Sequence, residues 1–125
     1  MTGPDTAAAL TPGVPVDLLA LPLDHEAVPA DQDQTPGGSG TTTAFRELGS
    51  AAGLDEAGVW EMAEGVMTDT EADELFLVVA GEGTVEFLDP PLPPARLRPG
   101  VMMRLSEGMQ TRWTVHSTLR KLYLG

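Results

Sequence analysis

One carboxylate and several hydroxyl groups are the side chains of this sequence whose spacing could support chemistry. Glu74 begins the apolar run ELFLVVA, and Thr68 and Thr70 precede it by six and four residues. A third threonine, Thr111, lies two residues before Trp113. A carboxylate beside hydroxyl groups can act as a general acid or base, or can anchor a polar small molecule.

Alternation along strands predicts that these side chains face one pocket. Successive side chains of a strand point to opposite faces, so even-numbered residues before Gly81 are expected to share the inward face. The expected ligand-binding residues are Thr68, Thr70, Glu74, Phe76, Thr111 and Trp113. Together they predict an apolar pocket with one polar patch. The alternative is a packed core in which Glu74 is solvated or paired with an arginine.

Short apolar segments separated by glycine and proline must position these residues. The expected strands are 42–48, 58–62, 74–80, 84–88, 95–97, 101–105, 111–115 and 119–124. Residues 74–80 and 84–88 flank a Gly-Glu-Gly turn and so predict a hairpin, whereas 89–94 contains too many prolines for a strand interior. Residues 49–58 are expected to form a turn with one helical turn. Many short strands at this spacing indicate an all-β sandwich or barrel.

The first 41 residues are expected to be an extended N-terminal strap and flexible loop, and residues 42–125 the barrel domain. Small residues with proline and glycine predict a frayed end over 1–14. The mostly apolar segment 16–23 is expected to be a strand or a strap across the barrel. Residues 29–41 have the polar, glycine-rich composition of a flexible loop.

The net charge is −12 and is unevenly distributed. Residues 1–89 carry 18 acidic side chains and one basic one, whereas residues 90–125 carry six basic and one acidic. Such an acidic chain repels phosphate backbones, so no nucleic-acid partner is expected. The basic tail is expected to pair across strands with the acidic part.

Disulfides are excluded because the chain has no cysteine. No apolar run is long enough to span a membrane, and the amino terminus lacks the basic region of a signal peptide. A cytoplasmic protein with no membrane partner is therefore expected.

Two short patterns in the strand-rich part resemble those of the cupin superfamily. Glu74 and Gly81 have the E-x6-G spacing that ends the first cupin motif, and Pro99-Gly100 and Gly108 follow the frame of the second. The fragments GVWEM, DELFLVVAGEGTVEF, RPG, EGMQTRWTV and LRKLYL resemble small single-domain cupins of the ureidoglycine-aminohydrolase-like subgroup. The resemblance implies a cupin-type jelly-roll barrel, a metal-dependent enzyme and a homodimer.

The metal ligands that the resemblance implies are largely missing. The histidine positions of the motifs fall on Thr68, Thr70 and Thr111. Threonine is a poor neutral ligand, because first-row transition ions prefer imidazole nitrogens or several carboxylates. Asp69 or Asp73 could assist a hard cation beside Glu74, but alternation predicts that both point away from the lumen. No metal and no other cofactor is expected.

The remaining aromatic and apolar residues have mainly structural interpretations. Trp60 and Trp113 are expected in the core, and His116 on the surface. The opposite face of the strand that begins at Glu74 carries an apolar stripe of Leu75, Leu77 and Val79. Because such a stripe is too apolar to face water, segment 16–23 or a second subunit must cover it. A homodimer is the favoured expectation.

Three functions stay open at this point, and whether the protein is an enzyme is one of the open questions. The first is a metal-independent protein that binds a small molecule in its barrel. The second is an enzyme acting on a small ureide, sugar or carboxylate, with Glu74 as general acid or base. The third is a structural or partner-binding dimer with a filled barrel.

Overall fold

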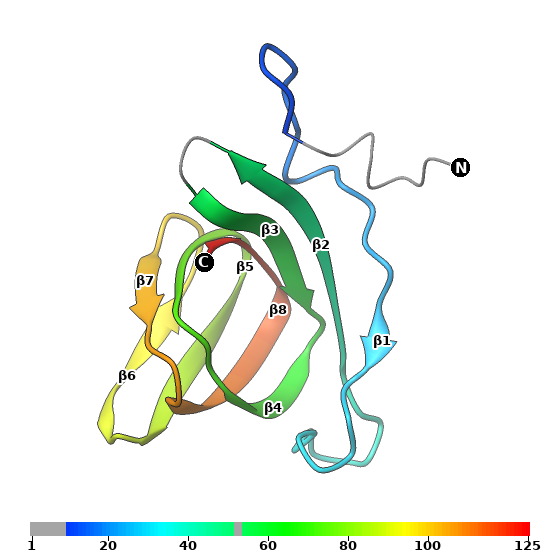
Figure 1. Cartoon of the computed structure of the whole chain (residues 1–125). Coiled ribbons are helices and arrows are strands. Elements are labelled where there is room, and N and C mark those ends of the chain that lie inside the picture. Colours follow the sequence, from blue (N-terminus) through cyan, green and yellow to red (C-terminus); the bar gives the residue numbers. More distant parts are fainter. Residues whose placement is uncertain (1–9, 52–53) are drawn as a thin grey trace.

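The computed structural model describes residues 10–51 and 54–125, and within these ranges the chain forms eight strands and no helix (Figure 1). The strands are β1 (Glu26–Ala27), β2 (Thr42–Ala51), β3 (Leu54–Met62), β4 (Gly65–Thr70), β5 (Glu74–Asp89), β6 (Leu92–Leu97), β7 (Met102–Leu105) and β8 (Gln110–Leu124). The predicted all-β class is confirmed. Nothing helical in the described ranges could cross a bilayer. Of the end expected to fray, residues 1–9 lie outside the described part.

Two long strands, β5 and β8, run through both layers of the barrel. The first half of β5 pairs with the second half of β8, where Phe76 lies opposite Tyr123. The second half of β5 pairs with the first half of β8, where Val85 lies opposite Trp113. One layer is extended by β7 and by β3, β2 and β1, and the other by β4 and β6. Figure 1 shows the layers closing around a common interior, which is the expected jelly-roll arrangement.

The predicted hairpin between residues 74–80 and 84–88 is wrong, because both segments belong to the single strand β5. Gly81 has a positive φ of 85°, a conformation that glycine adopts readily, and the strand bends there without reversing. The partner strand follows the bend with irregular register. The predicted strands 111–115 and 119–124 are likewise one strand, β8.

Two further local predictions are corrected at the sheet edges. Pro93 and Pro94 belong to strand β6, although their segment is not expected to be a strand interior. β6 lies at the end of the strand order, where one side is unpaired and missing N–H donors are tolerated. The expected helical turn is also wrong, because the described residues of 49–58 lie in β2 and β3.

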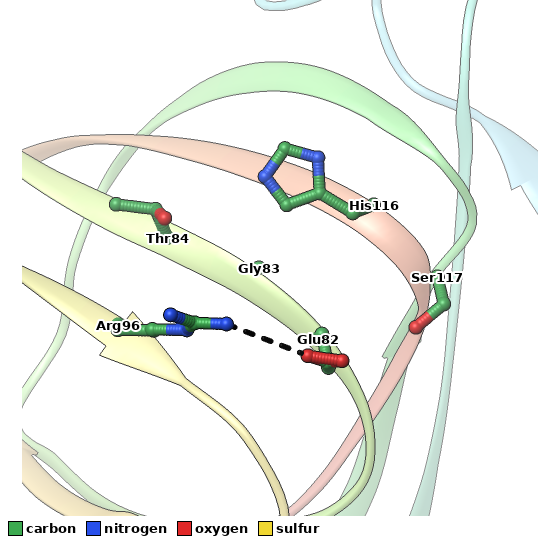
Figure 2. A pocket seen from close by; sticks show the side chains of 6 residues that line it. All are labelled: Glu82, Gly83, Thr84, Arg96, His116 and Ser117. Atoms are coloured by element: carbon green, nitrogen blue, oxygen red, sulfur yellow. Dashed lines mark ion pairs between the residues drawn. The ribbon is translucent and has the colours of Figure 1, made fainter.

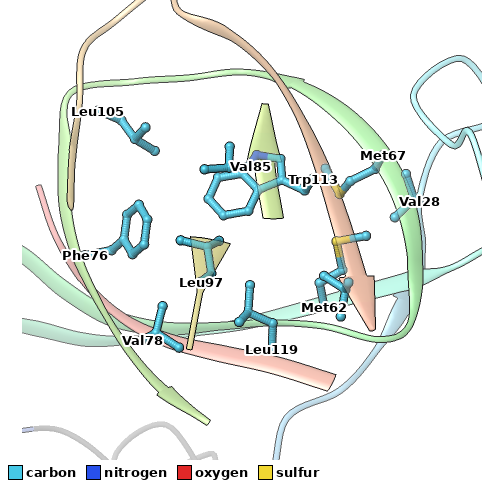
Figure 3. Packing of buried hydrophobic residues seen from close by; sticks show 11 residues of the cluster. Val28, Met62, Met67, Phe76, Val78, Val85, Leu97, Leu105, Trp113 and Leu119 are labelled. Atoms are coloured by element: carbon cyan, nitrogen blue, oxygen red, sulfur yellow. The ribbon is translucent and has the colours of Figure 1, made fainter. Parts of the chain in front are cut away.

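Apolar side chains from both layers fill the interior. Figure 3 shows them pointing toward one another; the buried cluster is Val28, Met62, Met67, Phe76, Val78, Val85, Leu97, Leu105, Trp113, Val115 and Leu119. The Trp113 ring lies 5.6 Å from that of Trp60 and 5.8 Å from that of Phe76, centroid to centroid. The expectation that both tryptophans are core residues is confirmed.

Residues 16–25, called the strap below, cross the outer face of the β2–β3 layer. Leu48 and Val59 on that face are covered by Val16, Leu18, Leu21 and Leu23. Arg120 Nη1 donates to the carbonyl oxygens of Leu18 and Leu21 at 2.8 and 2.9 Å. The expected stripe of Leu75, Leu77 and Val79 is half-buried beside this covered area. The strap therefore covers Leu48 and Val59, and coverage of the Leu75–Val79 stripe stays a prediction.

A polar network ties the strap to the sheet. Glu61 accepts a hydrogen bond from Arg120 Nε at 2.8 Å and contacts His25 Nε2 at 2.5 Å, while His25 Nδ1 lies 2.8 Å from Thr42 Oγ1. Burial raises the pKa of Glu61, but the hydrogen bonds from His25 and Arg120 outweigh it and hold the pKa below its ordinary value.

Candidate functional site

The polar residues of the interior gather at one end of the barrel, where β4 meets β8. Met67 lies directly opposite Trp113, and Asp69 lies directly opposite Thr111. Directly opposed residues of an antiparallel pair share a face, and both β8 residues are buried in the interior. Met67 and Asp69 therefore point inward.

The predicted inward orientation of Thr68 and Thr70 is wrong by one residue. Thr68 is half-buried and Thr70 is exposed, and they lie opposite the outward-facing residues of β8. The expectation that Asp69 points away from the lumen is wrong for the same reason. Burial of Met67, the largest apolar side chain of β4, decides the register, because a shift of one residue would move it into water.

A buried carboxylate that sequence reasoning did not single out lies just after β4. Glu71 accepts a hydrogen bond from Thr111 Oγ1 at 2.6 Å and another from Trp113 Nε1 at 3.0 Å. Its backbone N–H donates to the carbonyl oxygen of Met109 at 2.8 Å, and its own carbonyl accepts from Gly108 N at 2.9 Å. The signal that could have found Glu71 is the pairing of β4 with Trp113, which places the odd-numbered residues of β4 on the inner face.

Asp69 is the second carboxylate at this end of the interior. Its burial, which has the largest effect, and the nearby charge of Glu71 raise the pKa of Asp69 to about 6. The hydrogen bond from Thr70 N to Asp69 Oδ1, 2.9 Å long, acts in the opposite direction. Asp69 therefore exchanges its proton near neutral pH, as a general acid or base must.

Asp69 and Thr111 line a cavity of about 360 Å³, called the Asp69 cavity below. Its lining is Asp31, Gln32, Thr68, Asp69, Thr70, Leu88, Gln110 and Thr111. The three threonines that the sequence singles out thus do meet at one cavity, but Thr68 and Thr70 reach it from the rim. Loop residues 31–32 are held there by the hydrogen bond from Thr68 N to Gln32 O, 2.9 Å long.

The other predicted pocket residues do not line the Asp69 cavity. Phe76 and Trp113 face inward as expected, and both are packed in the core. Glu74 also faces inward, where Lys121 Nζ donates to its Oε2 at 2.8 Å. The alternative of a packed core with a paired Glu74 is therefore correct for this end, with lysine in place of arginine.

The interior donors do not fit the transition metal that the cupin motifs imply. The inward residues at the corresponding places are a methionine, Met67, a single carboxylate, Asp69, and a hydroxyl, Thr111. Glu74 is engaged by the Lys121 ammonium. Among the residues that the structure describes, no three His, Cys, Asp or Glu side chains lie close enough together to hold an ion.

A second cavity, a groove of about 560 Å³ over β5, β6 and β8, contains the predicted surface histidine (Figure 2). Arg96 and Glu82 face each other there at 3.9 Å, and both side chains are exposed. His116 is exposed as expected. Solvated ion pairs of this kind contribute little free energy, so the Asp69 cavity is the stronger candidate site.

The expected pairing of the basic tail with the acidic part of the chain is confirmed. Arg120 pairs with Glu61 at 2.8 Å, and Lys121 pairs with Glu74 at the same distance. Longer pairs of 3.9 Å join Arg112 to Glu86 and Arg96 to Glu82.

Comparison with known proteins identifies the barrel. Residues 49–123 match the family model of the EutQ-like cupin domain. No curated protein matches the chain. The solved EutQ protein of Clostridium difficile is 18% identical, with a TM-score of 0.58 over 79% of this chain and 78% of that one.

Other solved structures with the same architecture carry different names. A predicted oxalate decarboxylase of Thermotoga maritima is 12% identical, with a TM-score of 0.58 over 89% of this chain and 96% of that one. A structure of the DMSP lyases RdDddP and RnDddQII is 16% identical, with a TM-score of 0.59 over 82% of this chain and 54% of that one. At such identities the likeness shows the cupin fold alone.

Proposed function

Because the chain belongs to the EutQ-like cupin family, we propose that it is a cupin that binds a small polar molecule without a transition metal. Cupin barrels carry many different functions, so the family does not decide which one applies, and the site must be argued from its own chemistry. The ligand would bind in the Asp69 cavity, whose volume of about 360 Å³ suits a small molecule. Below the cavity, apolar side chains fill the interior of the barrel.

The observation that supports this proposal most is the polar cluster beneath an open cavity. Thr111 is fully buried, yet it carries a hydroxyl that donates to Glu71 at 2.6 Å. Asp69 lies beside Glu71, although two neighbouring carboxylates repel each other. Such an arrangement lowers the stability of the fold, and groups of this kind are typical of functional sites.

The lining indicates the chemical class of the ligand. The cavity is lined by two carboxylates, Asp31 and Asp69, and by no cationic side chain. Such a lining disfavours the carboxylate substrates that the sequence leaves open, because like charges repel. It favours molecules rich in hydrogen-bond donors, such as polyols, amines and ureides. A relation to the ureidoglycine-aminohydrolase-like subgroup stays a prediction.

A second candidate function is acid–base catalysis in the same cavity, with Asp69 in place of the expected Glu74. A pKa of about 6 allows Asp69 to accept and release a proton near neutral pH. Glu74 is less suited to this role, because its Oε2 is engaged by the Lys121 ammonium at 2.8 Å. The two functions differ only in whether a bound molecule is converted.

The partner proposed for the protein is a second copy of itself. Met102 is 60% exposed and lies opposite the half-buried Leu77 on the outer face, next to Leu75. A second subunit on this face would remove these apolar side chains from water. Sedimentation analysis of the wild type and of Leu77→Asp tests it; a monomeric wild type would refute it.

Binding can be tested by NMR titration of ¹⁵N-labelled protein with a panel of small polyols, amines, ureides and carboxylates. At least one donor-rich compound is expected to shift the amide signals of Asp69, Thr70 and Thr111 saturably. Asp69→Asn should weaken that binding at least about tenfold. The matched control, Glu82→Gln in the exposed groove, should leave it unchanged.

Two results would contradict the proposal. One is that no compound in the panel perturbs the cavity signals. The other is that Asp69→Asn and Glu82→Gln bind the compound equally well, which would place the binding elsewhere. Conversion of a bound compound, followed in the same samples, distinguishes acid–base catalysis from binding alone.

A further inference from the structure

Lys121, the chain's only lysine, is buried inside the barrel with 4% of its surface exposed. Its opposite neighbours are Trp60 on β3 and Val78 on β5, which both belong to the interior, so its side chain lies on the inner face. Lysine is rarely buried, because its ammonium loses favourable hydration there. Its place in the core therefore requires specific compensation.

Three aromatic rings and one carboxylate surround the ammonium. Lys121 Nζ lies 4.6 Å from the ring centroid of Trp60, and 4.5 Å from those of Phe76 and Trp113. It also donates to Glu74 Oε2 at 2.8 Å. The faces of aromatic rings attract cations within about 6 Å, most strongly where water is excluded. All four groups thus stabilise a positive charge at one point.

Packing alone does not explain this arrangement. An apolar side chain of similar volume would fill the space without removing an ammonium and a carboxylate from water. Replacement of a buried ion pair by apolar residues is often neutral or stabilising. The convergence of Glu74 with three ring faces therefore points to recognition of a cation.

We propose that Glu74, Trp60, Phe76 and Trp113 form an ammonium-binding site inside the barrel, and that the chain fills this site with its own Lys121. The site, called the ammonium cage below, suits a primary alkylammonium group. It is separate from the Asp69 cavity, since none of its four residues lines that cavity. The proposal therefore stands or fails independently of the proposed function.

The ammonium cage also accounts for the poor fit of the barrel to a metal ion. Glu74 is the one residue that matches a ligand position of the cupin motifs. Its carboxylate is neutralised by an ammonium 2.8 Å away, which occupies the space that an ion bound to Glu74 would need. The Lys121 ammonium thus takes the place of a bound cation beside Glu74.

The first test uses the wild-type protein and its single lysine. Reductive methylation with ¹³C-formaldehyde labels accessible amines, and only Lys121 and the amino terminus of this chain can react. The folded protein is expected to be methylated at Lys121 at least about tenfold more slowly than the urea-unfolded chain. Equal rates would show that the ammonium is not enclosed, and would overturn the proposal.

The second test distinguishes a cation site from ordinary burial. Lys121→Ala leaves a space in the ammonium cage that n-propylammonium can fill. The added ammonium is expected to raise the Tm of this variant by at least about 3 °C, whereas n-propanol of the same size should not. Leu119→Ala, which opens a space in the same core, is the matched control and should show no preference for the ammonium.

Each outcome of the second test is decisive. If n-propylammonium and n-propanol stabilise Lys121→Ala equally, the space is merely apolar and the proposal is wrong. If Lys121→Ala fails to fold alone, its refolding yield is compared with each additive present. Recovery with n-propylammonium alone supports the proposal, and recovery with neither or with both contradicts it.

Discussion

Replacing Asp69 with asparagine removes the carboxyl group whose pKa burial and Glu71 raise to about 6. In the unfolded chain the same group has its ordinary pKa of 3.8. The difference corresponds to roughly 3 kcal/mol at about 1.36 kcal/mol per pKa unit. Because Asp69 is only partly buried, solvent screening reduces the expected effect to about 1 kcal/mol.

The sign of this effect follows from proton binding. Below about pH 4 the group is protonated in both states, so it does not affect the free energy of unfolding. Between about pH 4 and pH 6 the unfolded chain loses the proton first, so this group lowers the stability of the fold as pH rises. Above about pH 6 the group is ionised in both states, and its destabilising effect on the fold no longer increases. Asp69→Asn should therefore be more stable than the wild type at pH 7, by about 1 kcal/mol.

Urea denaturation at a series of pH values between 4 and 8 measures this difference. Titrating groups distant from Asp69 affect both proteins alike, so the difference between the two curves reports Asp69 together with its coupling to Glu71. Asp31→Asn, on the exposed rim of the Asp69 cavity, is the matched control and should follow the wild type. Parallel curves for the wild type and Asp69→Asn would refute the reasoning about burial and charge.

Three further predictions concern stability. Thr111→Val removes a hydrogen-bond donor to Glu71 and should lower the free energy of unfolding, measured by urea denaturation, by about 1–3 kcal/mol. An unchanged denaturation midpoint would show that the hydrogen bond of 2.6 Å from Thr111 to Glu71 does not stabilise the fold. Gly81→Ala should lower the free energy of unfolding by at least about 1 kcal/mol more than Gly100→Ala does. Both glycines have a positive φ, but only a Cβ at position 81 would overlap a carbonyl of β8. Equal melting temperatures of the two variants would contradict this. Glu61→Gln should speed proteolytic cleavage in the strap at pH 7. Because the pKa of Glu61 is lowered, acidification should release the strap in the wild type and have less effect in the variant.

The fold class and much of the core could be predicted because β5 begins with an apolar run and β8 alternates polar and apolar residues around Trp113. Phe76 lies in the run and Trp113 in the alternating segment, and both face inward as alternation predicts. The continuity of each strand could not be predicted, since glycine at position 81 is compatible with both a turn and a bend. Only the pairing of β5 with β8 along their whole length distinguishes the two.

The site was harder to predict than the fold. In β4 the sequence GVMTDT alternates weakly, so tertiary pairing of Met67 with Trp113 decides which residues face inward. Thr68 and Thr70 therefore lie at the rim, whereas Asp69 faces inward. Lys121 was missed for a different reason: a charged residue in a strand is ordinarily solvated, and nothing local reveals three rings and a carboxylate from other strands.

The position of Trp113 links the two polar centres of the barrel. Its indole N–H donates to Glu71 beneath the cavity, while its ring face receives the ammonium of Lys121. A change at either centre therefore alters the surroundings of the same indole. Tryptophan fluorescence, to which Trp60 also contributes from a ring centroid 5.6 Å away, would therefore respond to changes at both the Asp69 cavity and the ammonium cage.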